Sequence, residues 1–233
     1  MRAHALAALG RAHEAYGSLG ALRQQQALPG DALDALQARW AAAMLADAPD
    51  ANALADRWDS LPKPLQGERG VVAAYAERAS GMRWDDAAAK SLEQAIDARF
   101  DESLVARYGA LPSPTPDVRR VQLERWLAAH PESPATLLAL AAVQRATGAW
   151  ASAETTLHRA VAQGGGAQAW EMLGDGYAAA GDAEASRLSY ANALRAVRGE
   201  APVGLPNRDL RQQIHDAAAI EVRDEHGVPR LRE

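Results

Sequence analysis

Six histidines are the side chains of this sequence best suited to bind a metal ion. They are His4, His13, His130, His158, His215 and His226. A helical zinc site usually needs two histidines one turn apart, as in the motif His-Glu-x-x-His. None of the six lies four residues from another, and none belongs to that motif. The spacing therefore predicts no metal site.

Acidic side chains are numerous, but they are not spaced for acid–base catalysis. The pairs Asp85-Asp86 and Asp224-Glu225 are adjacent, and adjacent residues on a helix point in different directions. The sequence has no Gly-x-Ser-x-Gly motif and no phosphate-binding loop. It has no cysteine, which excludes disulfides, thiolate metal sites, cysteine nucleophiles and covalent c-type haem attachment. We therefore predict that the protein has no enzymatic activity of its own.

Charge and hydropathy narrow the class of protein further. The formal net charge is −5, and both signs are mixed along the chain, with Lys63 and Lys90 as the only lysines. A nucleic-acid groove would need clustered basic residues, so we expect no nucleic-acid partner. No apolar run approaches about 18 residues, and no signal peptide is visible, so we expect a soluble chain. The composition is rich in helix-compatible residues and contains a single Phe, which supports strands poorly.

The elements that position these side chains are indicated by a pattern that occurs twice, 33 residues apart. Gly148 recurs as Gly181, Leu157 as Tyr190, Ala160 as Ala193, and Ala153 as the equally small Ser186. The second copy also contains Trp-x2-Leu-Gly-x2-Tyr, formed by Trp170, Leu173, Gly174 and Tyr177. This is the tetratricopeptide signature. We predict an all-α solenoid of tetratricopeptide-like helical hairpins, wound as a right-handed superhelix.

The residues of this pattern have two expected structural roles. Small residues let paired helices approach closely, and they are Ala153, Ala160, Gly174 and Ala193. Large residues fill the space between hairpins, and they are Trp170, Leu173, Tyr177 and Tyr190. Gly148 and Gly181 form the turns. The first copy departs from the signature, with Leu137, Ala141 and Gln144 in place of Trp, Gly and Tyr. We expect the six tryptophans to serve packing rather than a cofactor.

Four regions follow from the helical periodicity and its breaks. Residues 1–110 read as degenerate hairpin repeats, with a first helix over 3–20 and a turn at Gly81 between helices at 67–80 and 85–99. Residues 111–116 contain three prolines at alternate positions and form a stiff joint. Residues 117–200 hold one helix and the two clear repeats, at 134–166 and 167–199. Residues 201–233 are expected to form a capping helix with Leu210, Ile214, Ala217 and Ala218, then a frayed tail from Arg223.

Several short segments in order resemble one known family. They are Trp58-x-x-Leu61-Pro62, Tyr75-Ala76, Tyr108-Gly109-x-Leu111-Pro112 and Trp126-Leu127-x-x-His130-Pro131, followed by the two repeats. Over about residues 50–198 the chain is similar to the C-terminal part of the bacterial HemY family, tetratricopeptide proteins associated with haem biosynthesis. The unrelated flavin oxidase of the same name would need a Gly-x-Gly-x-x-Gly motif near its start, and none is present.

The resemblance implies a location and a partner. Members of the family lie in the bacterial inner membrane through an N-terminal hydrophobic anchor, which is not seen in this sequence, and the repeats are expected on the cytoplasmic face. The implied function is a non-catalytic scaffold that binds a late haem-pathway enzyme. The implied alternative is a protein that binds and transfers haem or porphyrin non-covalently, with one His or Tyr as the axial ligand. The sequence does not identify that ligand.

The remaining candidate site is the concave groove formed by the first helix of each repeat. In the last repeat this surface should include Gln168, Glu171 and Asp175, and in the preceding repeat Leu138 and Arg145. Clamps for a C-terminal carboxylate use Lys, Arg and Asn here, whereas the two repeats have Ala142 and Asp175 at the Asn positions and contain no Lys. We therefore predict a groove that binds a helix or a basic segment of a partner protein.

Overall fold

The computed structural model describes residues 5–6, 9, 11–25, 29–113, 115–206, 212, 214, 216, 222–223 and 229–230. The described residues are predominantly α-helical, as the composition predicts. They divide into two compact units, Met1–Pro112 and Ser113–Glu233, so the boundary falls within the proline-rich segment 111–116. Among the described helices, none has both the length and the apolar character needed to cross a lipid bilayer.

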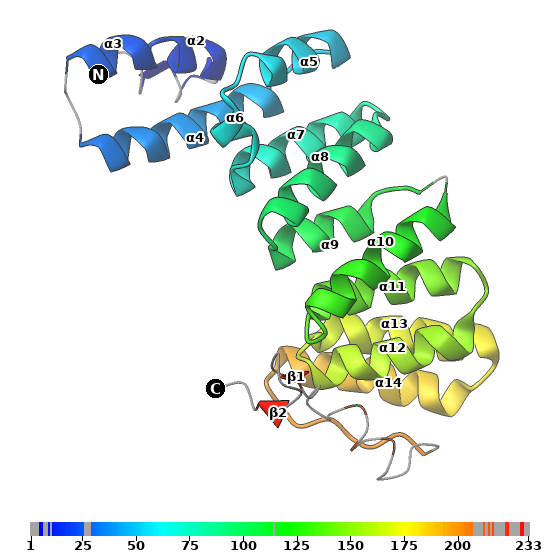
Figure 1. Cartoon of the computed structure of the whole chain (residues 1–233). Helices are drawn as coiled ribbons and strands as arrows, with labels where there is room; N and C mark the ends of the chain where they lie inside the picture. The colour runs from blue at the N-terminus through cyan, green and yellow to red at the C-terminus, as the bar shows by residue number, and fades with distance from the viewer. Residues whose placement is uncertain are drawn as a thin grey trace. The chain divides into compact units, whose positions relative to one another are not determined.

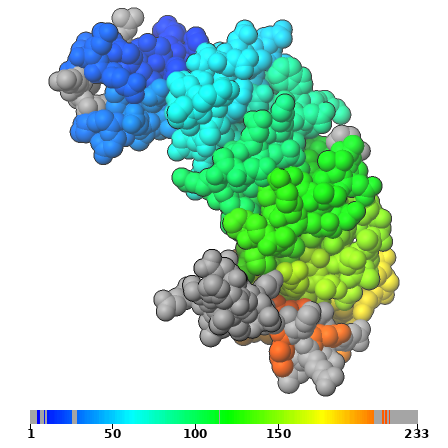
Figure 2. Space-filling model, in the orientation of Figure 1, coloured from blue at the N-terminus to red at the C-terminus, as the bar shows by residue number. Residues whose placement is uncertain are grey.

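The first unit is built around α4 and α7, which contact each other along their lengths. Helix α2 packs on α4, and α8 packs on α7 (Figure 1). In the space-filling view the side chains close the gaps between the ribbons of this unit (Figure 2). Its helices are α2 (Ala12–Gly17), α3 (Leu19–Gln24), α4 (Gly30–Ala46), α5 (Ala51–Asp59), α6 (Lys63–Gln66), α7 (Arg69–Gly81), α8 (Asp85–Ala98) and α9 (Glu102–Ala110).

The prediction of a single helix over 3–20 is wrong. Arg11 has a non-helical backbone, with φ −93° and ψ 54°, and the helix begins only after it, at Ala12. Ser18 then separates α2 from α3, and its hydroxyl donates a hydrogen bond of 2.9 Å to the carbonyl of Glu14. Such side-chain bonds compete with the regular helix pattern.

Two helices of this unit begin at aspartates that cap them. Asp50 accepts a hydrogen bond of 2.8 Å from the backbone N–H of Ala53, and Asp101 accepts bonds from Ser103 and Leu104 at 2.9 and 3.2 Å. Partial desolvation acts to raise the pKa of Asp101. The hydrogen bonds and the positive charge of Arg69 outweigh it and hold that pKa below its ordinary value. The carboxylate form of Asp101 therefore stabilises the start of α9.

The turn between α7 and α8 is not made by Gly81, as the sequence suggested. Gly81 is the last residue of α7, and the left-handed residue is Arg83, with φ 62°. The N–H of Trp84 donates a hydrogen bond of 2.8 Å to the carbonyl of Ala79, which closes the end of the helix. Arg83 thus occupies a position that normally favours glycine.

The second unit contains two helical hairpins, preceded by one further helix. Its helices are α10 (Pro116–Ala129), α11 (Pro134–Ala146), α12 (Trp150–Ala162), α13 (Gly166–Ala180) and α14 (Ala183–Val197). Helices α11 and α12 pair, α13 and α14 pair, and α12 contacts α13, so the hairpins stack directly on each other (Figure 1). Gly148 and Gly181 turn the two hairpins with φ 78° and 82°, as the repeat pattern predicts.

The core of this unit is formed by the repeat residues. Ala153, Leu157, Ala160 and Leu173 are fully buried, and Trp170, Tyr177 and Ala193 are almost so. Tyr190 differs from its predicted role as a filler between hairpins, because it is 40% exposed. Its ring lies over Gly174 of its own hairpin, where an added Cβ would lie 2.8 Å from the ring. Among the described residues no following helix covers Tyr190, which explains its exposure.

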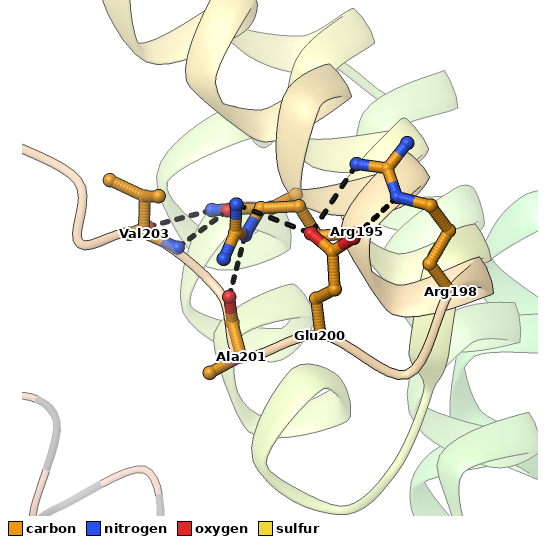
Figure 3. A network of polar contacts seen from close by, with 6 residues as sticks. Arg195, Arg198, Glu200, Ala201 and Val203 are labelled. Atoms are coloured by element: carbon orange, nitrogen blue, oxygen red, sulfur yellow. Dashed lines mark hydrogen bonds and ion pairs between the residues drawn. The ribbon is translucent and has the colours of Figure 1, made fainter.

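After the turn at Arg198 and Gly199, residues 200–205 are neither helix nor strand. The side-chain amide of Asn192 pairs with Val203, accepting from its N–H at 2.7 Å and donating to its carbonyl at 2.8 Å. Arg195 donates to the carbonyl of Ala201 at 2.6 Å, and Arg195 and Arg198 both contact Glu200 (Figure 3). The hydrogen bond from Arg198 lowers the pKa of Glu200. We call residues 200–205 the strap.

The predicted C-terminal segment is described only in part. Ile214 is helical and exposed, whereas Leu210, Ala217 and Ala218 lie outside the described residues. The expected frayed tail differs from the structure, in which β1 (Val222–Arg223) pairs antiparallel with β2 (Pro229–Arg230). Two residues in each strand are too few to produce the alternating pattern from which strands are predicted.

Candidate partner-binding surface

Helix α13 presents the predicted groove residues on one exposed face. Gln168, Glu171 and Asp175 are all exposed and recur at helical spacing. Ala178 extends the same face by one turn and is also exposed. The opposite face of α13 carries the buried Trp170, Leu173 and Tyr177. The amphipathic pattern that buries one side of α13 therefore leaves the polar side open to a partner.

Helix α11 lies beside α13 and contributes the other two predicted residues. Arg145 reaches across to α13, with Nη1 3.5 Å from Oδ2 of Asp175 and 3.4 Å from the carbonyl oxygen of Met172. Leu138 is half-buried and packs against the core beneath. Of the five predicted residues, the structure thus joins Arg145 to Asp175 and leaves Gln168 and Glu171 without such a contact.

Asp175 also has a partner on α14 that the sequence did not suggest. The hydroxyl of Tyr190 donates a hydrogen bond of 2.6 Å to Oδ1 of Asp175. This bond raises the pKa of Tyr190 above its ordinary value, because the neighbouring carboxylate favours the protonated phenol. Asp175 therefore accepts from both Arg145 and Tyr190, and it links three helices at the surface. Glu171 and Gln168 are better placed to contact a partner.

A second contact that sequence reasoning missed joins α12 to α13 through Gly176. A Cβ added at Gly176 would overlap the six-membered ring of Trp150. The same ring meets Tyr177 edge to face, with centroids 5.4 Å apart. The absence of a side chain at Gly176 is thus required by packing. No sequence signal marks this glycine, because Trp150 precedes it by 26 residues on another helix.

Among the described histidines, His158 is the buried one in this unit. It is 6% exposed, and its Nε2 lies 3.1 Å from the hydroxyl of Tyr177, which also donates a bond of 2.7 Å to Glu154. His158 lines a pocket of about 260 Å³ together with Trp170, Asp216 and the strap residues Val203 and Leu205. The pocket is mainly apolar, with an imidazole and a carboxylate at its edge.

Neither of the other described histidines lines this pocket. His13 is exposed on α2, and His130 follows the last residue of α10, whereas His4, His215 and His226 lie outside the described residues. Within the described part of the chain, no group of three His, Asp or Glu side chains is arranged to hold a metal ion.

Comparison of the chain with protein-family models, curated protein sequences and solved structures found no match. The resemblance to the HemY family therefore remains a prediction from the residues quoted above. The interpretation of the site depends on the geometry of the helices themselves.

Proposed function

We propose that the protein is a non-catalytic scaffold that binds another protein through the surface formed by α11 and α13. One observation carries this proposal: Gln168 and Glu171 stand exposed on one helix, beside an Arg145–Asp175 pair contributed by two helices. The polar groups are held by rigid helices, which is the arrangement that favours specific recognition of a helical or basic segment.

The helical hairpins further support a tetratricopeptide-like array. Gly148 and Gly181 have the same left-handed conformation, and the equivalent residues of α12 and α14 differ by 33 in number. The hairpin of α7 and α8 can be aligned with the hairpin of α11 and α12 by a shift of 65 residues, which places Arg83 at the position of Gly148. Ala88, Leu92 and Ala95 then match Ala153, Leu157 and Ala160, and all six are buried. A right-handed solenoid built from such units is part of the proposal.

The partner class follows from the resemblance and from the charge of the surface. A late enzyme of haem biosynthesis at the bacterial inner membrane is the proposed partner, with a basic or amphipathic segment that meets Glu171. The ion pair of Arg145 and Asp175 is partly exposed, so it contributes little to stability and serves chiefly to orient the two side chains.

The experiment is a binding assay with purified late haem-pathway enzymes, immobilised one at a time. The test variant carries Gln168→Arg and Glu171→Arg, which place two positive charges on the exposed face of α13. We expect one enzyme to bind the unmodified chain and the variant to bind it at least about tenfold more weakly, a change of about 1.4 kcal/mol. Both positions are exposed, so the fold should be unaffected.

Glu184→Arg is the matched control, because Glu184 is exposed in the first turn of α14 and outside the predicted groove. It changes the net charge by two, against three for the groove variant, and should leave binding within about twofold. If no late haem enzyme binds, the proposed partner class is wrong. If one binds and the groove variant and the control behave alike, the groove assignment is wrong.

A second candidate function, non-covalent haem binding, is favoured by one observation, the buried His158 beside an apolar pocket. Coordination of iron through Nε2 requires its contact with the Tyr177 hydroxyl to break. Titration with micromolar haem tests this function. A Soret shift that disappears in His158→Ala supports it, and the absence of any shift removes it.

A further inference from the structure

Helix α14 carries an exposed stripe along its outer face. Its members are Ala183, Arg187, Tyr190, Leu194 and Val197, which follow one another at alternating intervals of four and three residues. Leu194 is 62% exposed and Val197 is 75% exposed. Large apolar side chains arranged at this spacing on one helix face are typical of a surface that packs against another helix.

The equivalent face one repeat earlier shows what such a stripe contacts. On α12 the corresponding residues are Trp150, Glu154, Leu157 and Val161, each 33 residues before its counterpart. Trp150 lies against Gly176 and Tyr177 of α13, and Glu154 accepts a hydrogen bond of 2.7 Å from Tyr177.

Leu157 is fully buried, in one cluster with Trp170 and Leu173 of α13. The face of α12 is therefore covered by the first helix of the next hairpin.

On α14 the described residues provide no such helix. The residue 33 positions after Gly166, where α13 starts, is Gly199. From Ala201 to Leu205 the backbone is not helical, and Pro202 and Pro206 oppose a helix in that register. The side chains of Asn192 and Arg195 hold the strap by donating hydrogen bonds to the carbonyls of Val203 and Ala201 (Figure 3). The stripe is thus a stacking face that the strap leaves exposed.

Two of the differences between α12 and α14 indicate the chemistry of a helix that would dock on α14. Ala183 stands where α12 has Trp150, and it borders a shallow hollow of about 520 Å³. Arg187 stands where α12 has Glu154 and borders the same hollow. Within the described residues Arg187 forms no ion pair. A complementary helix needs a bulky side chain for the hollow and an acidic residue opposite Arg187.

We propose that the stripe of α14 binds an amphipathic helix of another protein, which docks as α13 docks on α12. The bound helix presents an aromatic residue to the hollow beside Ala183, an adjacent carboxylate to Arg187, and aliphatic residues to Leu194 and Val197. This surface adjoins the groove at Tyr190, which donates a hydrogen bond to Asp175, but it contains neither Gln168 nor Glu171, so different substitutions test the two sites.

The probe is a fluorescent helical peptide with the sequence of residues 166–180, changed by Gly176→Trp and Tyr177→Glu. The first change supplies the aromatic residue for the hollow, and the second supplies the carboxylate for Arg187. The unmodified peptide is the matched control probe. Fluorescence anisotropy with the full chain should show that the changed peptide binds at least about tenfold more tightly than the control.

Three exposed positions provide the protein variants. Ala183→Trp fills the hollow, Arg187→Glu reverses the charge, and Leu194→Glu places a carboxylate in the apolar part. Each should weaken binding of the changed peptide by at least about tenfold, with unchanged circular dichroism. Arg187→Glu should also bring the affinities of the two peptides together. The groove variant Gln168→Arg/Glu171→Arg should bind the changed peptide normally.

Three outcomes would overturn the proposal. One is equal affinity of the chain for the two peptides, and another is binding that survives all three substitutions. The third is a concentration-dependent dimer in light scattering that Leu194→Glu abolishes, because the face is then occupied by a second copy of this chain. Loss of the late haem enzyme in the groove variant, with peptide binding retained, would separate this site from the proposed function.

Discussion

Replacing Gly176 by Ala is expected to destabilise the protein, although the same change usually stabilises a helix. Ala is favoured over Gly inside a helix by about 0.8–1.0 kcal/mol. At Gly176 the new methyl group would overlap the Trp150 ring, so the indole must move away from both Gly176 and Tyr177. Whether Gly176→Ala stabilises or destabilises the protein therefore depends on whether the gain in helix propensity or the cost of displacing the indole is larger.

The opposing terms can be estimated from the geometry. Overpacking costs about 1–3 kcal/mol, and loss of an edge-to-face aromatic pair costs about 0.5–1.5 kcal/mol. After subtracting the helix gain, we expect Gly176→Ala to lower the free energy of unfolding by about 1–2 kcal/mol. In a Trp150→Ala background the obstruction is gone, and the same change should raise it by about 0.8–1.0 kcal/mol.

Urea unfolding of the four proteins in this double-mutant cycle measures both effects. The expected coupling between positions 150 and 176 is about 2–3 kcal/mol. Gly70→Ala in α7 is a control for the helix term, because an added Cβ there has no neighbour within 4 Å. If Gly176→Ala stabilises the protein with Trp150 present, the close packing of the indole on α13 is refuted.

Three further predictions concern single residues. Arg83→Gly should stabilise the protein by about 0.5–1 kcal/mol, because φ is 62° at that position and glycine adopts this conformation without strain. Met82→Gly should not stabilise it, because φ is −98° there, and urea unfolding distinguishes the two variants. Trp170→Ala should lower the free energy of unfolding by about 3–5 kcal/mol, because only 8% of the residue is exposed. Thermal unfolding at two scan rates measures this loss of stability. Asp101→Ala should lower the free energy of unfolding by about 1 kcal/mol at pH 7. The difference in stability between the two proteins should shrink as the pH falls below about 4 through the lowered pKa of Asp101, because the carboxylate form makes the stabilising contacts. Unfolding measured from pH 7 to pH 2.5 tests this.

The helices whose turns are marked by glycines of the repeat pattern were predicted well from the sequence. The bounds of α11 to α14 agree with the repeat pattern because Gly148 and Gly181 mark both turns. The turn before α8 was misplaced because its left-handed residue is Arg83, and Gly81 two residues earlier was taken for it. A propensity rule names the residue that is usual at a position, so it fails where another residue, here Arg83, has the left-handed conformation.

Contacts between helices were not predictable in the same way. The bond between Tyr190 and Asp175 and the packing of Trp150 on Gly176 join residues on different helices. The spacing of the repeat predicts which face of its helix each residue occupies. The side-chain rotamers that make the contacts depend on the packing of both helices. The sequence could therefore locate the polar face of α13 and could not show that Asp175 is already engaged.

The composition of α14 argues against an ordinary terminal helix. A terminal repeat normally has a polar outer face, because exposed apolar side chains promote association. Tyr190, Leu194 and Val197 nevertheless keep the apolar character of a stacking face. Two of the positions that differ from α12 would decide which helix fits, since Ala183 opens space and Arg187 inverts a charge. A face that had only lost its neighbour would be expected to become polar throughout. Retained apolar residues with altered size and charge at the contact points are instead what selective binding of a different helix requires.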